Sequence, residues 1–250
     1  MSNHAQLKQQ LRSLKLSGMT ETIDLRLDQA EQRQLAHSEL LSLLIDDELE
    51  TRRNRKLARL VLQARLPANQ TLETFDFRFN PSINAISIRE LGTLRFMEKA
   101  ENIFFIGPTG VGKTHLVRAI AHLVCRKYMS VLFYNFNSLL ADIAKSEMTG
   151  KRDNLLKAII KSDLLIIDDF AFKKITPQSA EYIYTIVDER YRQKSTLFTS
   201  NRSIEDWLHI FPDQIMANAI LDRLAHNAHQ IIIKGESYRK VNGVKIKNGK

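Results

Sequence analysis

Residues 107–114 read GPTGVGKT, and this stretch decides the fold of the chain. Its spacing matches G-x-x-x-x-G-K-[ST], a loop whose backbone N–H groups surround phosphate. Three of the nine glycines lie between Gly107 and Gly112, where they allow backbone angles that a β-carbon would forbid. The apolar stretch NIFFI (102–106) predicts a short buried strand, and residues 115–126 carry apolar residues at helical spacing. A strand before and a helix after are the context that this motif requires, so the sequence predicts a nucleotide-binding core.

All eight residues of this loop are expected to contact the nucleotide: Gly107, Pro108, Thr109, Gly110, Val111, Gly112, Lys113 and Thr114. Within the loop, Lys113 has the reach to contact the β- and γ-phosphates, and the Thr114 hydroxyl is an oxygen ligand for Mg²⁺. The helix that follows turns its positive N-terminal end toward the phosphates. ATP and Mg²⁺ are therefore the cofactors that the sequence predicts.

A second motif, LLIIDDF, occupies residues 164–170. An apolar strand that ends in an acid is the Walker B arrangement of P-loop nucleotidases. Asp168 is expected to bind Mg²⁺, directly or through water, beside Thr114. Asp169 is expected to orient or deprotonate the water that attacks the γ-phosphate. A P-loop alone indicates nucleotide binding, whereas the two motifs together predict ATP hydrolysis.

Two further polar residues are candidates for catalysis. Asn201 follows the apolar stretch TLFTS (196–200), and its amide is expected to hydrogen-bond the attacking water or a phosphate oxygen. Arg223 lies on an apparent helix, from which it could reach the γ-phosphate of a neighbouring subunit and stabilise transition-state charge. An ordinary salt bridge on a helix face is the alternative for Arg223, and it is the one that the residues alone favour.

The rest of the chain predicts two domains. Further apolar stretches, each flanked by helical patterns, occur at 131–135, 164–168, 196–200 and 230–234. Because these stretches do not alternate with polar residues, they predict a parallel sheet covered on both faces, which is an α/β fold. Residues 1–66 instead carry helical patterns and predict a small helical N-terminal domain. Residues 67–250 are expected to form the nucleotide-binding core, which ends in a basic tail.

The net charge of +9 favours a polyanionic partner. Basic residues cluster at 51–56, at Lys151 and Arg152, at Lys173 and Lys174, and in the last twenty residues. A solvated face explains any one cluster, but several clusters on an ATP-binding chain favour nucleic acid. The two pairs, at 151–152 and 173–174, are the candidate DNA contacts.

The composition also indicates where the protein works. No apolar stretch approaches the length of a membrane span, and the N-terminal MSNHAQLKQQ has no apolar signal region. The single cysteine, Cys125, excludes an internal disulfide and fits a reducing compartment. A cytoplasmic location without membrane contact is therefore expected.

Taken together, the segments GPTGVGKTHL, LLIIDDF, TSNRS and ILDRLAHNAHQIIIKGESYR, with the preceding TLETFDFRFNPSIN, closely resemble the IstB family. These proteins are the AAA+ ATP-binding helpers of insertion-sequence transposition, related to the DnaC helicase loaders and more distantly to the DnaA initiator. The resemblance covers essentially the whole chain, and its last segment is much more specific than the P-loop. It implies an AAA+ αβα core preceded by a small helical domain.

The resemblance also implies ATP-dependent assembly on double-stranded DNA, followed by recruitment or stimulation of an IstA-type transposase. Assembly would be a homo-oligomer with ATP at its subunit interfaces, where Arg223 matches the arginine finger of the family. Lys151 and Arg152 lie where this clade carries an additional helix, and are candidates for phosphate contacts. The chain departs from the common AAA+ pattern at Asp169, where Glu is usual, so that its carboxylate reaches one methylene less far.

Two alternatives stay open from the sequence. A replicative helicase loader would use the same ATP site, but its N-terminal region would bind a helicase. A pull-down that compares binding of a transposase with binding of a helicase would separate the two functions. A small-molecule kinase also uses a P-loop, but it needs an acceptor pocket and usually a basic lid, for which no motif is present. ATP turnover stimulated by duplex DNA, with no phosphorylated acceptor, would exclude the kinase.

Overall fold

The computed structural model describes residues 3–238 and residue 240, and it divides into two compact units, Met1–Arg59 and Leu60–Lys250. The division falls inside a helix, α3 (His37–Gln63), a few residues before the boundary expected at 66. The last ten residues, which hold much of the predicted basic tail, lie outside the described part of the chain.

The first unit consists of α1 (Asn3–Ser13), α2 (Ser17–Arg33) and the part of α3 up to Arg59. Its two longer helices meet at Gly18, where an added Cβ would lie 2.6 Å from the backbone of α3. Beside this contact the buried carboxylate of Glu48 accepts hydrogen bonds from the backbone N–H groups of Gly18 (2.7 Å) and Met19 (3.3 Å) and from Arg52 (2.6 Å). Burial alone would raise the pKa of Glu48, but the hydrogen bonds from Arg52, Gly18 and Met19 outweigh it and lower the pKa.

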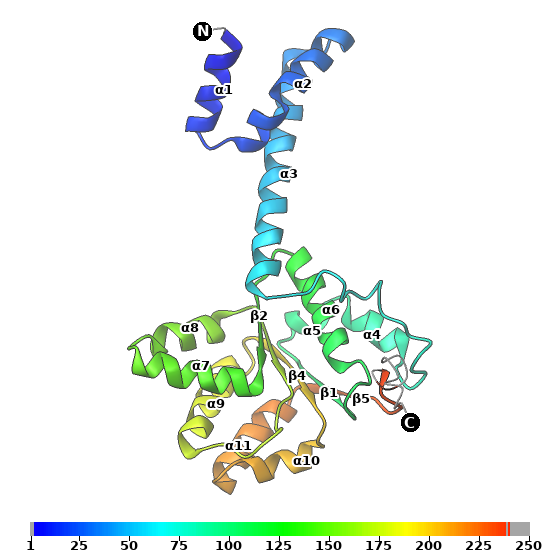
Figure 1. Cartoon of the computed structure of the whole chain (residues 1–250), viewed down its shortest axis with the longest axis vertical. Coiled ribbons are helices and arrows are strands. Elements are labelled where there is room, and N and C mark those ends of the chain that lie inside the picture. The colour runs from blue at the N-terminus through cyan, green and yellow to red at the C-terminus, as the bar shows by residue number, and fades with distance from the viewer. Residues whose placement is uncertain (1–2, 239, 241–250) are drawn as a thin grey trace, which may run out of the picture. The chain divides into compact units, whose positions relative to one another are not determined.

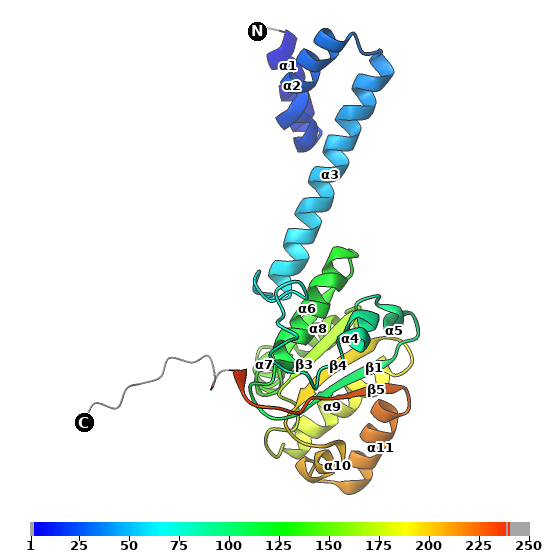
Figure 2. The same ribbon diagram turned by 90° about the vertical axis from the view of Figure 1, so that its right-hand side faces the viewer.

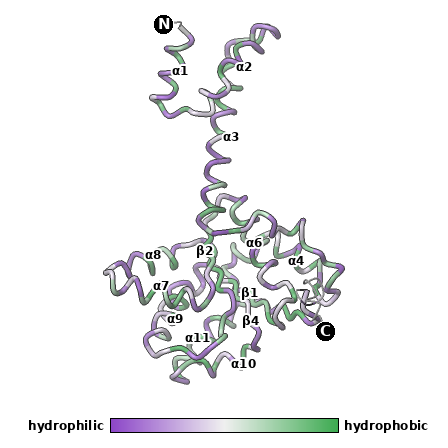
Figure 3. The backbone as a smooth tube through the Cα atoms, in the orientation of Figure 1, coloured by the Kyte–Doolittle hydropathy of each residue, from purple (hydrophilic) through white to green (hydrophobic). Residues whose placement is uncertain are grey.

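The second unit is built on a five-stranded parallel sheet, as expected, in the order β2-β3-β4-β1-β5. The strands are β1 (Asn102–Ile106), β2 (Val131–Asn135), β3 (Leu164–Asp168), β4 (Ser195–Ser200) and β5 (Ala228–Ile232). Strand β5 begins two residues earlier than the apolar stretch at 230–234 predicts, because its pairing with β1 starts at Asn102 opposite Ala228. Four of the five residues of β1 are buried, and hydrophobic residue types follow one another along this strand in Figure 3.

Helices cover both faces of this sheet. They are α4 (Ala85–Leu91), α5 (Arg95–Glu98), α6 (Lys113–Arg126), α7 (Phe136–Met148), α8 (Arg152–Lys161), α9 (Pro177–Arg190), α10 (Ile204–Trp207), the 3₁₀ turn η1 (Leu208–Ile210) and α11 (Gln214–Ala225).

On one face, Phe104 and Phe198 of the sheet pack in one core with α7, α8, α9 and α11. Side chains alternate along a strand, so the buried Ile103 and Phe105 point to the other face, which α6 crosses. Figures 1 and 2 show α6 on one side of the sheet and α9 and α11 on the other. The unit is therefore an αβα sandwich.

Candidate nucleotide-binding site

The predicted site residues follow neighbouring strands at one edge of the sheet. Because the strands are parallel, their carboxyl ends share one edge, which is where open α/β sheets bind ligands. The P-loop follows β1, Asp168 ends β3 and Asn201 follows β4. The central position of β1 and β4 thus brings together residues almost a hundred positions apart.

The P-loop has the backbone that its glycines predict. Gly110 and Gly112 have φ angles of +87° and +104°, in the left-handed region that L side chains rarely adopt. An added Cβ would lie 2.1 Å from the Ser237 hydroxyl at Gly110 and 3.0 Å from the Phe75 ring at Gly112. Helix α6 then begins at Lys113, so its N-terminal N–H groups face the loop. The loop therefore leaves a space for an anion, and side chains at these glycine positions would fill that space.

Lys113 is the cation at the centre of this cradle. Its buried Nζ donates hydrogen bonds of 2.7 Å to the carbonyl oxygens of Gly107 and Pro108 and to Oδ1 of Asn201. The amide of Asn201 in turn donates to the Thr109 hydroxyl at 3.0 Å. Asn201 thus lies within one hydrogen bond of the P-loop lysine.

The predicted metal ligands also lie together. The Thr114 hydroxyl donates to Asp168 Oδ1 at 3.0 Å, and the Thr199 hydroxyl donates to the same oxygen at 2.5 Å. Burial raises the pKa of Asp168; the hydrogen bond from Thr199 opposes this and the charge of Asp169 adds to it. A divalent cation would offset this buried negative charge, and hydroxyl and carboxylate oxygens are the ligands that Mg²⁺ prefers. The donor set therefore fits Mg²⁺.

Asp169 is positioned by two residues that the sequence analysis missed. Its Oδ2 accepts a 3.1 Å hydrogen bond from Nδ2 of Asn135 at the end of β2, and its N–H donates to the Thr199 hydroxyl at 2.9 Å. Its φ of +56° turns the chain out of β3. The sequence did carry a signal for both residues: VLFYN and TLFTS end in polar residues, and the carboxyl ends of parallel strands lie together at one edge of the sheet.

A cavity of about 500 Å³ extends from the P-loop, Asp168, Asp169 and Asn201. Its other wall is formed by residues of the segment 70–80, with Tyr238. Side chains of α6 hold this segment and the residues before it: His115 contacts the carbonyl oxygen of Thr71 (3.0 Å), and His122 contacts that of Pro67 (2.9 Å). The aromatic stretch TLETFDFRFNPSIN (71–84) thus closes the cavity on the side opposite the P-loop.

Arg223 lies elsewhere, on α11 against α9. Its guanidinium donates to Asp188 at 2.7 Å, to the Ala219 carbonyl at 2.9 Å and to the Tyr184 hydroxyl at 3.3 Å, and it stacks 5.2 Å from the Tyr184 ring centre. It does not line the P-loop cavity. If Arg223 contacts ATP, that ATP would therefore be bound in the P-loop cavity of another subunit.

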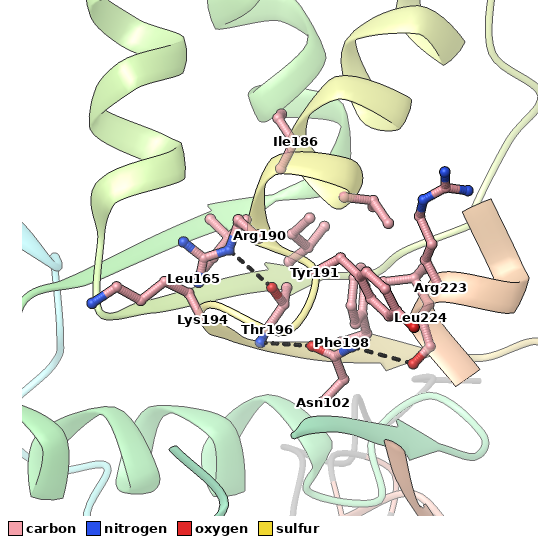
Figure 4. A pocket seen from close by; sticks show the side chains of 12 residues that line it. Asn102, Leu165, Ile186, Arg190, Tyr191, Lys194, Thr196, Phe198, Arg223 and Leu224 are labelled. Atoms are coloured by element: carbon pink, nitrogen blue, oxygen red, sulfur yellow. Dashed lines mark hydrogen bonds between the residues drawn. The ribbon is translucent and has the colours of Figure 1, made fainter. Parts of the chain in front are cut away.

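Arg190, at the end of α9, was not singled out by its sequence. It is 2% exposed and donates to carbonyl or hydroxyl oxygens of Ile159, Ile160, Ser162, Ser195 and Thr196, as Figure 4 shows for Thr196. Burial lowers its pKa to about 10, so it remains charged at neutral pH. The cation ties the end of α8 to the start of β4, and its role is structural.

The candidate DNA-binding residues lie at the start of α8 and in the loop between β3 and α9. Lys151 precedes α8, and Arg152 begins that helix, where it pairs with Glu147 (3.3 Å) and Asp153 (3.1 Å). Lys173 and Lys174 are exposed in the loop between β3 and α9. No helix among the described residues is long and apolar enough to cross a membrane.

A parallel sheet of this order, with a P-loop after β1, an acid at the end of β3 and a polar residue after β4, defines the AAA+ class of P-loop nucleotidases. Comparison with known proteins specifies the family. The family model described as "IstB-like ATP binding protein" matches residues 9–245, and the chain belongs to this family.

Named relatives agree with this assignment. The chain is 37% identical to an ATP-binding protein in an insertion sequence of Mycobacterium tuberculosis, over 93% of both chains. It is 35% identical to the IS21 ATP-binding protein of Pseudomonas aeruginosa, over 92% of this chain and 86% of that protein.

Solved structures share the fold. The DnaC helicase loader superposes with a TM-score of 0.56 at 23% identity, over 67% of this chain and 98% of that one. The replication initiator DnaA bound to AMPPCP and single-stranded DNA superposes with a TM-score of 0.58 at 19% identity, over 68% of this chain and 51% of that one.

Proposed function

We propose that the chain is a Mg²⁺-dependent ATPase that assembles on double-stranded DNA in the cytoplasm and recruits or stimulates an IstA-type transposase. The assembly would be a homo-oligomer with ATP at its subunit interfaces. The observation that carries this proposal is the grouping of Lys113, Thr114, Asp168 and Asn201 at one sheet edge. The membership of the chain in a family of insertion-sequence ATP-binding proteins supports the transposition role.

In the ATP site, each residue has a separate task. Lys113 would exchange its contacts with Gly107, Pro108 and Asn201 for the β- and γ-phosphate oxygens. Thr114 and Asp168 would hold Mg²⁺, which supplies charge neutralisation on the phosphates when bound. Asp169 would orient the attacking water.

On DNA, the positive net charge of +9 would supply affinity through phosphate contacts with little dependence on base sequence. Lys151, Lys173 and Lys174 are exposed for such contacts. Arg152 would exchange Glu147 and Asp153 for a phosphate, and both of those pairs are solvent-exposed and therefore weak.

ATP turnover with and without duplex DNA tests the proposal. We expect Lys113→Ala to lose ATP binding and, with it, stable DNA assembly, because Lys113 is the one mobile charge in the P-loop. We expect Asp169→Asn to bind ATP but hydrolyse it slowly, so that its DNA complexes persist longer. Turnover that is indifferent to DNA, or unchanged ATP affinity in Lys113→Ala, would contradict the proposal.

The partner is tested by capture from defined mixtures. The ATP-bound protein on DNA should retain an IstA-type transposase and leave a replicative helicase in solution. Retention of the helicase alone would favour a DnaC-like loader. Transfer of the γ-phosphate to a small acceptor would indicate a kinase.

A further inference from the structure

The loop between β3 and α9 exposes an aromatic side chain beside two lysines. Phe172 is 62% exposed, and Lys173 and Lys174 follow it on the surface. Among the described residues, neither lysine side chain has a hydrogen-bond or ion-pair partner. A large apolar group therefore stands in water next to two uncompensated charges.

The backbone of the loop is anchored on both sides of this exposed group. Phe170 is 1% exposed and packs edge-to-face against Phe198 and Trp207, with ring centres 5.1 and 4.7 Å away. Its N–H donates to the Thr199 carbonyl at 2.8 Å. At the other end, the Ile175 N–H donates to the Ile210 carbonyl at 3.0 Å. The exposure of Phe172 is thus built into an anchored turn.

Ala171 turns the chain between the buried and the exposed phenylalanine. It is fully buried and has a φ of +62°, in the left-handed region that an alanine rarely adopts. In extended backbone the side chains of Phe170 and Phe172 would point to the same side. The left-handed turn at Ala171 accounts for one ring entering the core while the other faces solvent.

Phe172 also lies beside the candidate catalytic residues. It lines a cavity of about 130 Å³ together with Asp169, Phe170, Asn201 and Arg202. Arg202 is exposed and adds a third positive charge to the rim. Whatever binds against Phe172 therefore approaches the two residues proposed to act at the γ-phosphate.

We infer that residues 172–174 form a nucleic-acid contact, in which the Phe172 ring lies against a base and Lys173 and Lys174 contact backbone phosphates. The combination of cations and an exposed aromatic face is the one that binds nucleic-acid strands with little sequence preference. Contact at Phe172 would bear on Asp169 and Asn201 through the shared cavity, and would make ATP turnover depend on DNA. This inference rests on the proposed function in DNA binding and specifies where a base is contacted.

The first test places a reporter at the contact. In Phe172→Trp the new indole is exposed, whereas the one native tryptophan, Trp207, is fully buried and donates to Ser200 at 3.1 Å. We expect ATP-dependent binding of DNA to quench the fluorescence of the new indole, with the wild type as the control for Trp207. Duplex and single-stranded DNA are titrated separately: quenching by the duplex indicates insertion between base pairs, and quenching by the single strand alone indicates stacking on unpaired bases.

Affinity and turnover give the second test. We expect Phe172→Ala to bind DNA about five- to hundredfold more weakly and to lose most DNA stimulation of turnover, with ATP affinity and DNA-free turnover unchanged. The DNA affinity and the DNA stimulation of Phe172→Leu should lie between those of Phe172→Ala and the wild type. The double variant Lys173→Gln, Lys174→Gln should lower the slope of log K against log salt by up to about 1.8.

The matched control is Ile215→Ala, which removes a comparably exposed apolar group, 81% exposed, on α11. It should bind DNA as the wild type does. If the wild type binds DNA while Phe172→Ala binds equally well and the fluorescence of Phe172→Trp is unquenched, the inference is wrong and the proposed function stands. A change in assembly of Phe172→Ala without DNA would make the loop a subunit contact and overturn the inference, and absence of DNA binding by the wild type would overturn both.

Discussion

Replacing Arg223 with alanine has two calculable consequences, one for stability and one for catalysis. Within the subunit, Arg223 pairs with Asp188 at 2.7 Å, but the two side chains are 27% and 45% exposed, so the pair contributes about 0.2–1 kcal/mol. Its stacking on Tyr184 at 5.2 Å adds about 0.5–1 kcal/mol. Together the ion pair and the stacking contribute about 1–2 kcal/mol, which is small beside the stability of an ordinary domain, about 5–15 kcal/mol. Arg223→Ala should therefore stay folded and bind ATP.

The catalytic consequence is much larger if Arg223 acts on ATP held by a neighbouring subunit. Arginine fingers contribute about a thousandfold or more to turnover, which corresponds to about 4 kcal/mol. To act in this way Arg223 must leave Asp188, at a cost of up to about 1 kcal/mol, or about fivefold. Asp188→Asn removes that cost, so we expect its turnover to change by no more than about fivefold, whereas Arg223→Ala should be inactive.

Mixing experiments provide the decisive assay. Lys113→Ala subunits retain the arginine but cannot use their own site, and Arg223→Ala subunits have an intact site without the arginine. Mixtures should recover part of the ATPase activity, because some interfaces pair a working site with a working arginine. If all mixtures stay inactive although the two proteins co-assemble, Arg223 does not act across an interface. Arg202, which lines the cavity of Asp169 and Asn201, is then the next candidate.

The remaining predictions concern the fold and the P-loop. The pKa of Glu48 is lowered on folding, so the stabilisation that its carboxylate provides is complete at pH values above the unfolded pKa and is lost as the pH falls through the folded pKa. Glu48→Gln should remove this acid sensitivity, which is measured by the hydrogen exchange of the Gly18 N–H. In Arg190→Lys the ammonium group has only three N–H donors for the acceptors on five residues that the guanidinium now satisfies. This variant should lower the free energy of unfolding by about 3 kcal/mol, measured by urea titration of the variant and the wild type at neutral pH. Gly112→Ala places a Cβ against Phe75 at a φ of +104° and should weaken ATP binding, measured by calorimetry, while the fold persists; undiminished affinity would mean that the loop tolerates a side chain.

The sequence by itself determined the features that depend on neighbouring residues in the chain. The P-loop glycines, the apolar strands and the helix after Lys113 each follow from local backbone and burial preferences, so the parallel α/β fold was predictable from their order. The P-loop and Walker B motifs were predictable for the same reason. The start of β5 was not, because it depends on which residue of β1 it pairs with.

Only the tertiary structure decided which side chains meet. Asn135 holds Asp169 because β2 and β3 pair in a register that sets Asn135 opposite Asp168, and no spacing along the chain encodes that register. Arg190 appears in the sequence as an ordinary charge near the end of a helix, and its burial depends on the packing of α8, α9 and β4 around it. Phe172 is the opposite case: a residue type that is usually buried faces water because one left-handed residue turns the chain. Local patterns encode the elements, whereas contacts between distant residues follow only from the way those elements pack.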